Sequence, residues 1–298
     1  TIFRKWTAVD AYGNMTMATD TIQIRRIGLD DVILPPSYND LELPSLICSD
    51  NFPVNPDGNP SPDFTGFPDV GACDKFQFTY TDLNFNMCGN TFKVVREWVV
   101  YDWCTSESIE YYQTLKITDT IPPIINCPPD RTVSTDNFEC NTGLVLLAQP
   151  ESIDNCSEVE ITVSVTNPEG NPVLVTENTG NFVVADLPLG LTTVIYTSTD
   201  ECGNSSSCIS TITVVDLLPP TPVCEGHTNV SLNNLGTARL YASSIDDGSY
   251  DNCELATIRI AKMTDACGSG ANIYGEYVDL CCAEIGAPVM VALEVIDI

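Results

Sequence analysis

The chain has 298 residues and a formal net charge of -29, from 41 acidic and 12 basic side chains. This charge repels phosphate, so nucleic acid is excluded as a partner and an anionic membrane surface is disfavoured. Because 43% of the residues are hydrophobic, the chain can still build folded cores. Its length suggests about two to four domains.

Cysteine usage indicates the compartment. The 14 cysteines are spread along the chain without a C-x-x-C pair, and His227 is the only histidine. Disulfides are therefore favoured over zinc sites, which predicts an extracellular, cell-surface location. No apolar run approaches the roughly 18 to 20 residues that span a bilayer, so we expect no membrane insertion. The first residues lack a signal-peptide pattern, and we expect a processed product or part of a longer chain.

A set of landmarks repeats along the sequence. Pro-Pro pairs occur at 35–36, 122–123 and 219–220. After each of the last two pairs, a Cys follows at +4, an Asp-Asn-Cys at +31 and an Asp at +77. The late Asp belongs to a series with intervals of 92, 98 and 97 residues, namely Asp10, Asp102, Asp200 and Asp297. The repeat unit therefore has about the size of one small β domain.

In chain order, this register predicts four segments. They are the terminal β-hairpin of an incomplete immunoglobulin-like domain (1–30), an immunoglobulin-like β domain (31–121), a second such domain (122–218), and a domain lacking its last strand (219–298). Two explanations for this arrangement remain open. The chain is a stretch of a longer tandem-repeat protein, or residues 1–27 of one copy fill the open edge of residues 219–298 in another and build a filament.

The middle segment shows the strand pattern most clearly. Short runs rich in β-branched residues alternate with turn sequences, at 160–166, 173–176, 192–197 and 209–215. No window has convincing 3.6-residue periodicity with caps, so helix should be minor. About seven short strands in such a length are typical of a sandwich. We predict an all-β fold of tandem immunoglobulin-like antiparallel β-sandwich domains.

The residues that carry the register also carry a family resemblance. The middle segment resembles the hyalin-repeat (HYR) domain. The resemblance is carried by Ile125–Asp130, Asp154–Cys156, Tyr196–Asn204 and Val214–Asp216. The segments 31–121 and 219–298 are similar to modules of large secreted surface proteins of Bacteroidota. The residues that carry this similarity are Cys48–Asn51 and Arg96–Cys104 in the first, and Ser243–Cys253, Cys281–Cys282 and Val289–Val295 in the second. The resemblance implies an immunoglobulin-like fold, export, and an adhesive or structural role without catalysis. Residues 31–121 depart from it, because they lack the Asp-Asn-Cys.

Within this frame, the cysteines of the middle domain are expected to gather at one end of the sandwich. Cys156 with Cys202, and Cys127 with Cys208, are plausible pairs, each adding about 2–4 kcal/mol of stability. Cys140 is left over.

Calcium is the main chemical hypothesis. Asp246, Asp247 and Asp251 lie in one loop, and Asp265 lies one predicted hairpin away. Dense carboxylate oxygens suit Ca²⁺, although the EF-hand spacing is absent. Weaker sites between domains could form from Asp154-Asn155 with Asp200 and from the linker residues Asp119 and Asp216. The alternative is that these Asp and Asn side chains only form turns.

Other candidate sites are sparse. No carboxylate pair stands out for catalysis, and His227 is interpreted as a surface or strand-start residue, so no enzyme is predicted. Trp6 and Trp98 are predicted core residues, whereas Trp103 beside a turn is the ligand candidate for glycan stacking. Thr21 and Thr120 lie in Asp-Thr-aliphatic sequences that resemble the O-glycosylation motif of Bacteroidota.

The sequence thus predicts an extracellular structural or adhesive repeat protein that forms a cell-surface fibre or filament, with strand exchange between copies as one route. Its partners would be itself, neighbouring repeats or surface glycans, with Ca²⁺ as the one cofactor considered. The alternative is an adhesin module that binds a glycan or protein through its loops; an accessory region of an enzyme is a third hypothesis.

Overall fold

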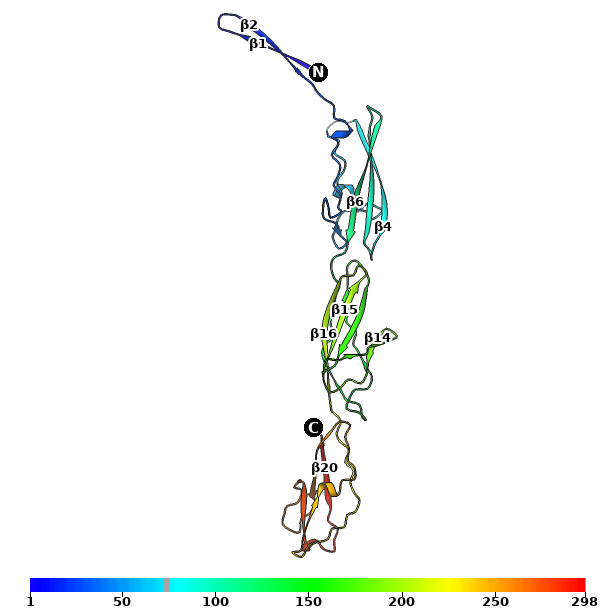
Figure 1. The fold of residues 1–298 in the computed structure, drawn as a ribbon, viewed down its shortest axis with the longest axis vertical. Helices are drawn as coiled ribbons and strands as arrows, with labels where there is room; N and C mark the ends of the chain where they lie inside the picture. Colours follow the sequence, from blue (N-terminus) through cyan, green and yellow to red (C-terminus); the bar gives the residue numbers. More distant parts are fainter. Residues whose placement is uncertain (72–74, 298) are drawn as a thin grey trace. The chain divides into compact units, whose positions relative to one another are not determined.

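The computed structural model describes residues 1–71 and 75–297. Strands make up nearly all of its regular structure (Figure 1). The chain folds into two compact units. Unit 1 comprises residues 1–123, 154–159 and 200–204, and unit 2 comprises residues 124–153, 160–199 and 205 onward. Unit 1 therefore includes two short segments that the sequence assigns to the second domain.

Unit 1 begins with a two-stranded hairpin. β1 (Ile2–Val9) pairs antiparallel with β2 (Met15–Ile22), and neither strand pairs with a third one among the described residues. Asp10 closes the turn, because its Oδ1 accepts hydrogen bonds from the backbone N–H groups of Tyr12 and Asn14, each at 2.9 Å. This side-chain mimic of a backbone turn explains why the late Asp recurs in the sequence.

The main sheet of unit 1 has the order β3-β6-β5-β4. Its strands are β3 (Leu46–Ile47), β4 (Phe76–Asn86), β5 (Phe92–Asp102) and β6 (Glu107–Thr118), and the short turns before them are η1 (Leu29–Asp31) and α1 (Pro62–Thr65). Buried residues alternate along β5, as expected for a strand with one face on a core. The apolar core is small and contains Leu46, Val94, Leu115 and Ile117.

A buried cation completes this core. The Arg96 side chain is fully buried and forms an ion pair with Asp82, with Nε to Oδ1 at 2.7 Å. Its guanidinium also donates to the Pro60 carbonyl and lies 4.7 Å from the ring centroid of Tyr80. Trp98, on the same face of β5, is fully buried, as the sequence predicts. Replacing Asp82 would leave the buried Arg96 charge without its counter-ion.

Residues 124–215 form two facing layers and a short edge pair. The sheet orders are β12-β11-β15-β16-β8, β13-β14-β9 and β10-β7. The strands are β7 (Ile124–Asn126), β8 (Arg131–Ser134), β9 (Val145–Leu146), β10 (Glu151–Ile153), β11 (Val159–Thr166), β12 (Pro172–Val173), β13 (Thr176–Asn178), β14 (Asn181–Val184), β15 (Gly190–Asp200) and β16 (Ser205–Val215). The core of unit 2 packs Val145 and Val184 of the smaller sheet against Val194 and Ile212 of the larger one.

The last part of unit 2 has four strands in two pairs. β17 (Thr237–Tyr241) pairs with β19 (Tyr277–Cys281), and β18 (Leu255–Lys262) pairs with β20 (Val291–Asp297). Two 3-10 turns, η2 (Ala242–Ser244) and η3 (Cys282–Glu284), follow β17 and β19. The core here is small, with five buried residues led by Ile260. In the part of the chain that the structure describes, β20 has one strand neighbour, whereas its counterparts β5 and β15 have two.

The all-β prediction is confirmed, with two corrections of detail. The predicted runs 160–166, 192–197 and 209–215 lie within β11, β15 and β16, and the run 173–176 is divided between β12 and β13. The sheets are not purely antiparallel, because β8 pairs parallel with β16 and β3 pairs parallel with β6. Trp6 lies in a strand as expected but is 58% exposed, because β1 has no sheet packed against it.

The four segments predicted from the sequence do not coincide with the two compact units. Each named strand pairs only with strands of its own predicted segment (1–30, 31–121, 122–218 or 219–298). The division into compact units is coarser, and it moves residues 154–159 and 200–204 into unit 1. Among the described residues, no helix is long and apolar enough to cross a membrane.

Candidate functional site: two acidic clusters bordered by disulfides

Five disulfides are present among the described residues. They are Cys48–Cys156, Cys88–Cys202, Cys127–Cys208, Cys140–Cys253 and Cys267–Cys281. The pairing of Cys127 with Cys208 is the one that the sequence suggested. The pairing of Cys156 with Cys202 is wrong, because each of these cysteines bonds to a cysteine of residues 31–121. Cys73 lies outside the described residues, and Cys104, Cys224 and Cys282 are exposed and free.

Three of the five disulfides cross a predicted domain limit. Within unit 1, the first two connect residues 31–121 with the loop 154–159 and the turn 200–204. Within unit 2, Cys140 of the middle segment bonds to Cys253 of the last one. In both cases, the cysteine of an Asp-Asn-Cys motif is joined to the segment that precedes it. Sequence reasoning missed this rule because it looked for partners inside each repeat.

Backbone packing reinforces the first of these connections. The backbone N–H of Asn90 donates to the carbonyl of Cys156 at 2.9 Å. Gly89, at φ +53°, lies so close to the loop that an added Cβ would be 2.4 Å from the Cβ of Ser157 and 3.0 Å from the Cys156 carbonyl oxygen. A side chain cannot be placed there without displacing the loop.

We call Asp119, Asp154 and Asp200 the first linker site. Asp119 follows β6, Asp154 follows β10, and Asp200 is the last residue of β15, so three separate chain segments of unit 1 contribute. Carboxylate oxygens of Asp119 and Asp200 lie within 4.8 Å of each other and of the Cys202 sulfur. That sulfur is committed to a disulfide and is no thiolate ligand. The cluster is therefore one of oxygen donors.

Asp119 is the buried member of the first linker site. The residue is 8% exposed; its Oδ1 accepts a hydrogen bond from the backbone N–H of Ile121 at 3.1 Å, and its buried Oδ2 has no hydrogen-bond partner. Burial, together with the charges of Asp154 and Asp200, raises the pKa of Asp119 above its ordinary value. A carboxylate in this position gains from a cation or from a proton.

The other two carboxylates are held by hydrogen bonds. Oδ1 of Asp154 accepts from the backbone N–H groups of Cys156 and Ser157, at 2.8 and 3.0 Å. Although burial opposes ionisation of Asp200, hydrogen bonds from the Asn204 side chain and from backbone N–H groups lower its pKa below the usual value. The site thus presents negative charge towards Asp119.

We call Asp216 and Asp251 the second linker site, in unit 2. Their carboxylate oxygens lie within 4.8 Å of each other and of the disulfide-bonded Cys253 sulfur. Asp251 accepts from the Cys253 backbone N–H through Oδ2 at 2.8 Å, whereas its buried Oδ1 has no hydrogen-bond partner. Oδ1 of Asp216 accepts from the Thr135 hydroxyl at 3.1 Å, and Thr135 in turn accepts from the Asn252 side chain. The arrangement repeats the first linker site with one carboxylate fewer.

The predicted calcium residues Asp246, Asp247, Asp251 and Asp265 are not brought together as one site. Asp246 accepts from the Ser249 backbone N–H, and Asp247 follows it in a turn. Asp265 instead forms an ion pair with the buried Lys262, at 2.9 Å, and accepts from the backbone of its own turn. These contacts, led by Lys262, lower the pKa of Asp265. Only Asp251 of the four belongs to a cluster of acidic donors, and its partner there is Asp216.

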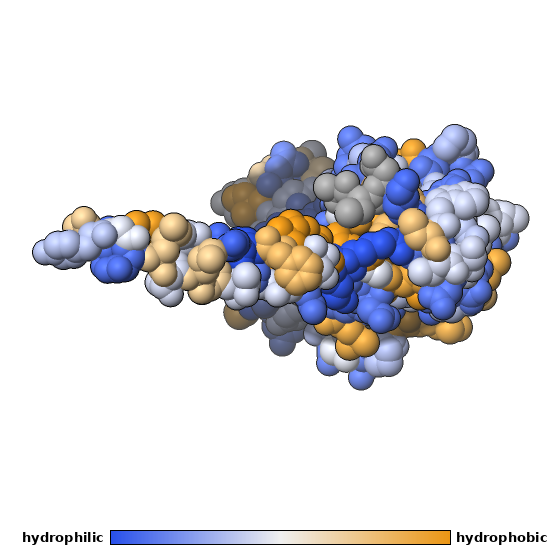
Figure 2. Space-filling view, turned by 90° about the horizontal axis from the view of Figure 1, so that it is seen from above, coloured by the Kyte–Doolittle hydropathy of each residue, from blue (hydrophilic) through white to orange (hydrophobic). Residues whose placement is uncertain are grey.

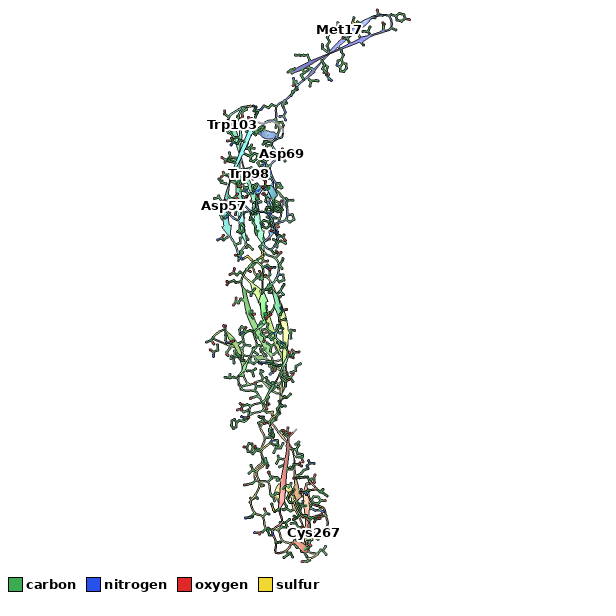
Figure 3. The ribbon with its side chains drawn as sticks, turned by 180° about the vertical axis from the view of Figure 1, so that it is seen from behind. Met17, Asp57, Asp69, Trp98, Trp103 and Cys267 are labelled. Carbon is green, nitrogen blue, oxygen red and sulfur yellow. A yellow bond between two sulfur atoms is a disulfide. The ribbon has the colours of Figure 1, made fainter. Side chains whose placement is uncertain are left out.

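Trp103 lies where a ligand could reach it. Its side chain is 61% exposed and packs edge-on against Tyr101, with ring centroids 4.9 Å apart. Figure 3 shows it near one end of the sheet, with Trp98, which is fully buried, further along. A shallow depression of about 540 Å³ borders the same turn, lined by Asp102, Thr105 and residues 26–30 among others. Thr21 and Thr120, the glycosylation candidates, are both exposed.

The β1–β2 hairpin exposes an unusual amount of apolar surface. Phe3, Val9, Met15 and Met17 share one face and are between 59% and 75% exposed. Figure 2 shows apolar residues interspersed with hydrophilic ones along the projecting hairpin, and Figure 3 marks Met17 on it. Exposed apolar strands with free edges are typical of surfaces that bind other strands.

Comparison with known proteins gives a partial similarity. No family model matches the chain. The chain is 28% identical over 137 residues to hyalin of the sea urchin Strongylocentrotus purpuratus, a match that covers 45% of this chain and 10% of hyalin. The chain therefore spans about a tenth of the curated relative it matches.

Solved structures with similar chains are multi-domain β proteins. Human CDH23 EC21-23 covers 65% of this chain and 74% of its own, at 11% identity and a TM-score of 0.31. Protocadherin gammaB7 EC3-6 covers 74% and 64%, at 13% identity and a TM-score of 0.34. The four N-terminal immunoglobulin domains of Dscam1 isoform 6.9 cover 68% and 53%, at 13% identity and a TM-score of 0.31. All three TM-scores are below 0.5, so we infer nothing about function from these structures.

Proposed function

We propose that the chain is a section of an extracellular structural or adhesive fibre whose successive repeats are bonded to one another to bear tension. The observation that carries the proposal is the set of three disulfides that cross predicted domain limits. The partial similarity to hyalin and the disulfide-rich composition support an extracellular repeat protein. The proposal assigns no catalytic step to the chain.

Under tension, a disulfide that lies on the load path limits how far the chain can extend, whereas one that only stabilises a domain closes a short loop. A chain pulled from both ends can extend only along its shortest covalent path. With all five disulfides closed, the shortest path crosses from Cys48 to Cys156, returns along the chain to Cys140 and crosses to Cys253. Without the two disulfides of unit 1, the path instead follows the chain from Cys48 to Cys140, which adds about 76 residues or, at about 3.3–3.6 Å per residue, roughly 25–27 nm of contour length. Cys267–Cys281 closes only 14 residues and withholds about 5 nm.

Single-molecule pulling of the chain tests this role. Replacing Cys48, Cys156, Cys88 and Cys202 together by Ser should lengthen the fully extended chain by roughly 25–27 nm. The Cys267→Ser/Cys281→Ser variant is the matched control and should add only about 5 nm. If the four replacements leave the extended length unchanged, the disulfides are not in the load path and the proposal fails.

We further propose that copies associate by strand exchange between β2 and β20. In the middle domain, the penultimate strand β15 is flanked by β16, which also pairs with β8. Among the described residues, β20 has the place of β15 in the register but has only β18 as a neighbour. In the same part of the chain, β2 has the place of β16 and pairs only with β1. Placing β2 of one copy beside β20 of another would satisfy the open edge and cover the apolar hairpin face.

Met17 provides a paired test of association. Met17→Asp introduces a charge on the apolar face of β2, and Thr16→Asp introduces the same charge on its opposite face. By sedimentation velocity and electron microscopy, Met17→Asp should shorten the assemblies while Thr16→Asp leaves them closer to wild type. Assemblies of equal length in all three proteins would contradict strand exchange.

A second candidate function, recognition of a glycan or protein through loops, is favoured by the exposed Trp103, which packs edge-on against Tyr101. Stacking on Trp103 would change its fluorescence, whereas the buried Trp98 would respond little. Trp103→Ala should then abolish binding on a glycan array, with Leu83→Ala, another exposed residue of unit 1, as control. Equal binding by both variants would exclude Trp103 as a ligand contact.

A further inference from the structure

We propose that the first linker site binds calcium through Asp119, Asp154 and Asp200, and that the second linker site binds it more weakly through Asp216 and Asp251. The inference is independent of strand exchange and of the mechanical role proposed above. Calcium is thus expected at the linker sites and not at the site predicted from the sequence, which consisted of the loop 246–251 together with Asp265.

The first argument is the coincidence of two unsatisfied carboxylates. Among the described residues, four buried side-chain oxygens lack a hydrogen-bond partner: Asp119 Oδ2, Ser134 Oγ, Thr192 Oγ1 and Asp251 Oδ1. Both carboxylates in this set belong to linker sites, and each lies within 4.8 Å of another carboxylate. Leaving a buried acceptor unmatched beside like charge costs free energy, so a ligand that supplies positive charge is the missing element.

The second argument is that the same positions are used twice. Asp119 and Asp216 both precede a Pro-Pro pair by three residues, and Asp154 and Asp251 both begin an Asp-Asn-Cys. In unit 1, Asp119 lies beside the Cys48–Cys156 disulfide, and Asp154 accepts from the backbone N–H of Cys156. In unit 2, Asp216 and Asp251 both lie beside Cys253 of the Cys140–Cys253 disulfide. Asp297, the register counterpart of Asp200, ends β20 opposite Leu255, and the structure does not group it with Asp216 and Asp251. The second site therefore has fewer charges and should bind less tightly.

The donor chemistry favours calcium over other metals. The cysteine sulfurs near both sites are in disulfides, and the only histidine, His227, belongs to neither group, so the soft donors that zinc prefers are missing. Carboxylate oxygens suit Ca²⁺, which accepts irregular geometry and completes its shell with carbonyls and water. Mg²⁺ demands near-octahedral geometry and should bind less well.

A bound ion would connect segments that the disulfides already hold close. Asp119 lies on the linker, Asp154 on the loop after β10, and Asp200 at the tip of the β15–β16 hairpin. Calcium would neutralise their mutual repulsion and fix the linker to the two loops of unit 1. The competing possibility is a proton on Asp119 that is shared with a neighbouring carboxylate, in which case calcium has no effect.

Calorimetric titration of CaCl₂ into the full chain, after chelator treatment, tests the proposal. The wild type should bind calcium in a tighter and a weaker phase, with a higher melting temperature than in chelator. Asp119→Asn should lower the calcium affinity of the tighter phase at least about tenfold. Even residues that only hydrogen-bond to a metal's ligands typically change its affinity by this factor. Asp216→Asn should remove the weaker phase alone.

The control is Asp57→Asn, an exposed turn residue of unit 1 (labelled in Figure 3) with the same change of charge. It should leave both phases unchanged. No heat from the wild type and no calcium effect on its melting would overturn the proposal, as would equal weakening by Asp57→Asn. If Asp119→Asn fails to fold by circular dichroism, Asp154→Asn replaces it, and an unchanged tighter phase in that variant also overturns the assignment.

Discussion

The two linker sites differ in the number of disulfides and carboxylates that they contain. At the first, two disulfides and a backbone hydrogen bond from Asn90 hold the loops 154–159 and 200–204 against residues 31–121, and three carboxylates lie beside them. At the second, one disulfide connects residues 122–218 with 219–298, and two carboxylates lie beside it. The difference shows that the Asp-Asn-Cys motif is the common element, and that the hairpin-turn cysteine Cys202 is an addition at the first site only.

The largest expected difference concerns stability after removal of the disulfides. Replacing Cys48, Cys156, Cys88 and Cys202 by Ser should destabilise unit 1 by more than the about 2–4 kcal/mol typical of one bridge, but by less than twice that, because the two loops overlap. Replacing Cys140 and Cys253 should cost unit 2 about 2–4 kcal/mol. Urea unfolding measures both, and a larger loss in unit 2 would reverse the comparison.

A smaller effect is expected from the close approach at Gly89. Gly89→Ala should destabilise unit 1 by about 1–3 kcal/mol, because the new Cβ would overlap Ser157 and press on the loop 154–159. Gly58→Ala is the control, since Gly58 has a similar left-handed φ but nothing within 4 Å of an added Cβ. Thermal melting of the two variants separates overlap from backbone strain, and equal losses would mean that the loop contact contributes nothing.

The smallest effect is the acid sensitivity that Asp265 contributes to unit 2. Because the pKa of Asp265 is lowered in the folded state, its contribution to stability is present above the unfolded value of 3.8 and is lost as the pH falls through the lower folded value. Melting followed from pH 5 to pH 2 should therefore drop more steeply in the wild type than in Asp265→Asn. Asp279→Asn, which removes an exposed ion pair with Arg239, should retain the wild-type slope.

The sequence predicted the fold well because strands leave a local signal. Runs rich in β-branched residues identify β11 to within one residue and the central part of β15 and β16, which extend two to four residues beyond the predicted runs. The short strands β9, β12 and β13 have two or three residues each, too few for a pattern to show. Trp6 was misplaced because an alternating strand looks the same whether or not another layer covers it.

The site was predicted in its residues but not in its connections. Asp119, Asp154, Asp200 and Asp216 were recognised from the register as a possible set between domains. The pairing of Cys156 and Cys202 with cysteines more than 100 residues earlier was not, since disulfide connectivity depends on three-dimensional proximity that spacing does not encode. Asp265 was assigned to calcium because the sequence does not reveal that Lys262 lies against it.

The long-range disulfides also determine the order in which parts of the chain can mature during export. A chain exported from its N-terminal end presents Cys48 and Cys88 well before their partners, which follow 108 and 114 residues later. Both thiols must stay reduced, or be reshuffled by an isomerase, until the next repeat has emerged and folded its loop and hairpin. The maturation of one repeat thus waits on the arrival of its successor.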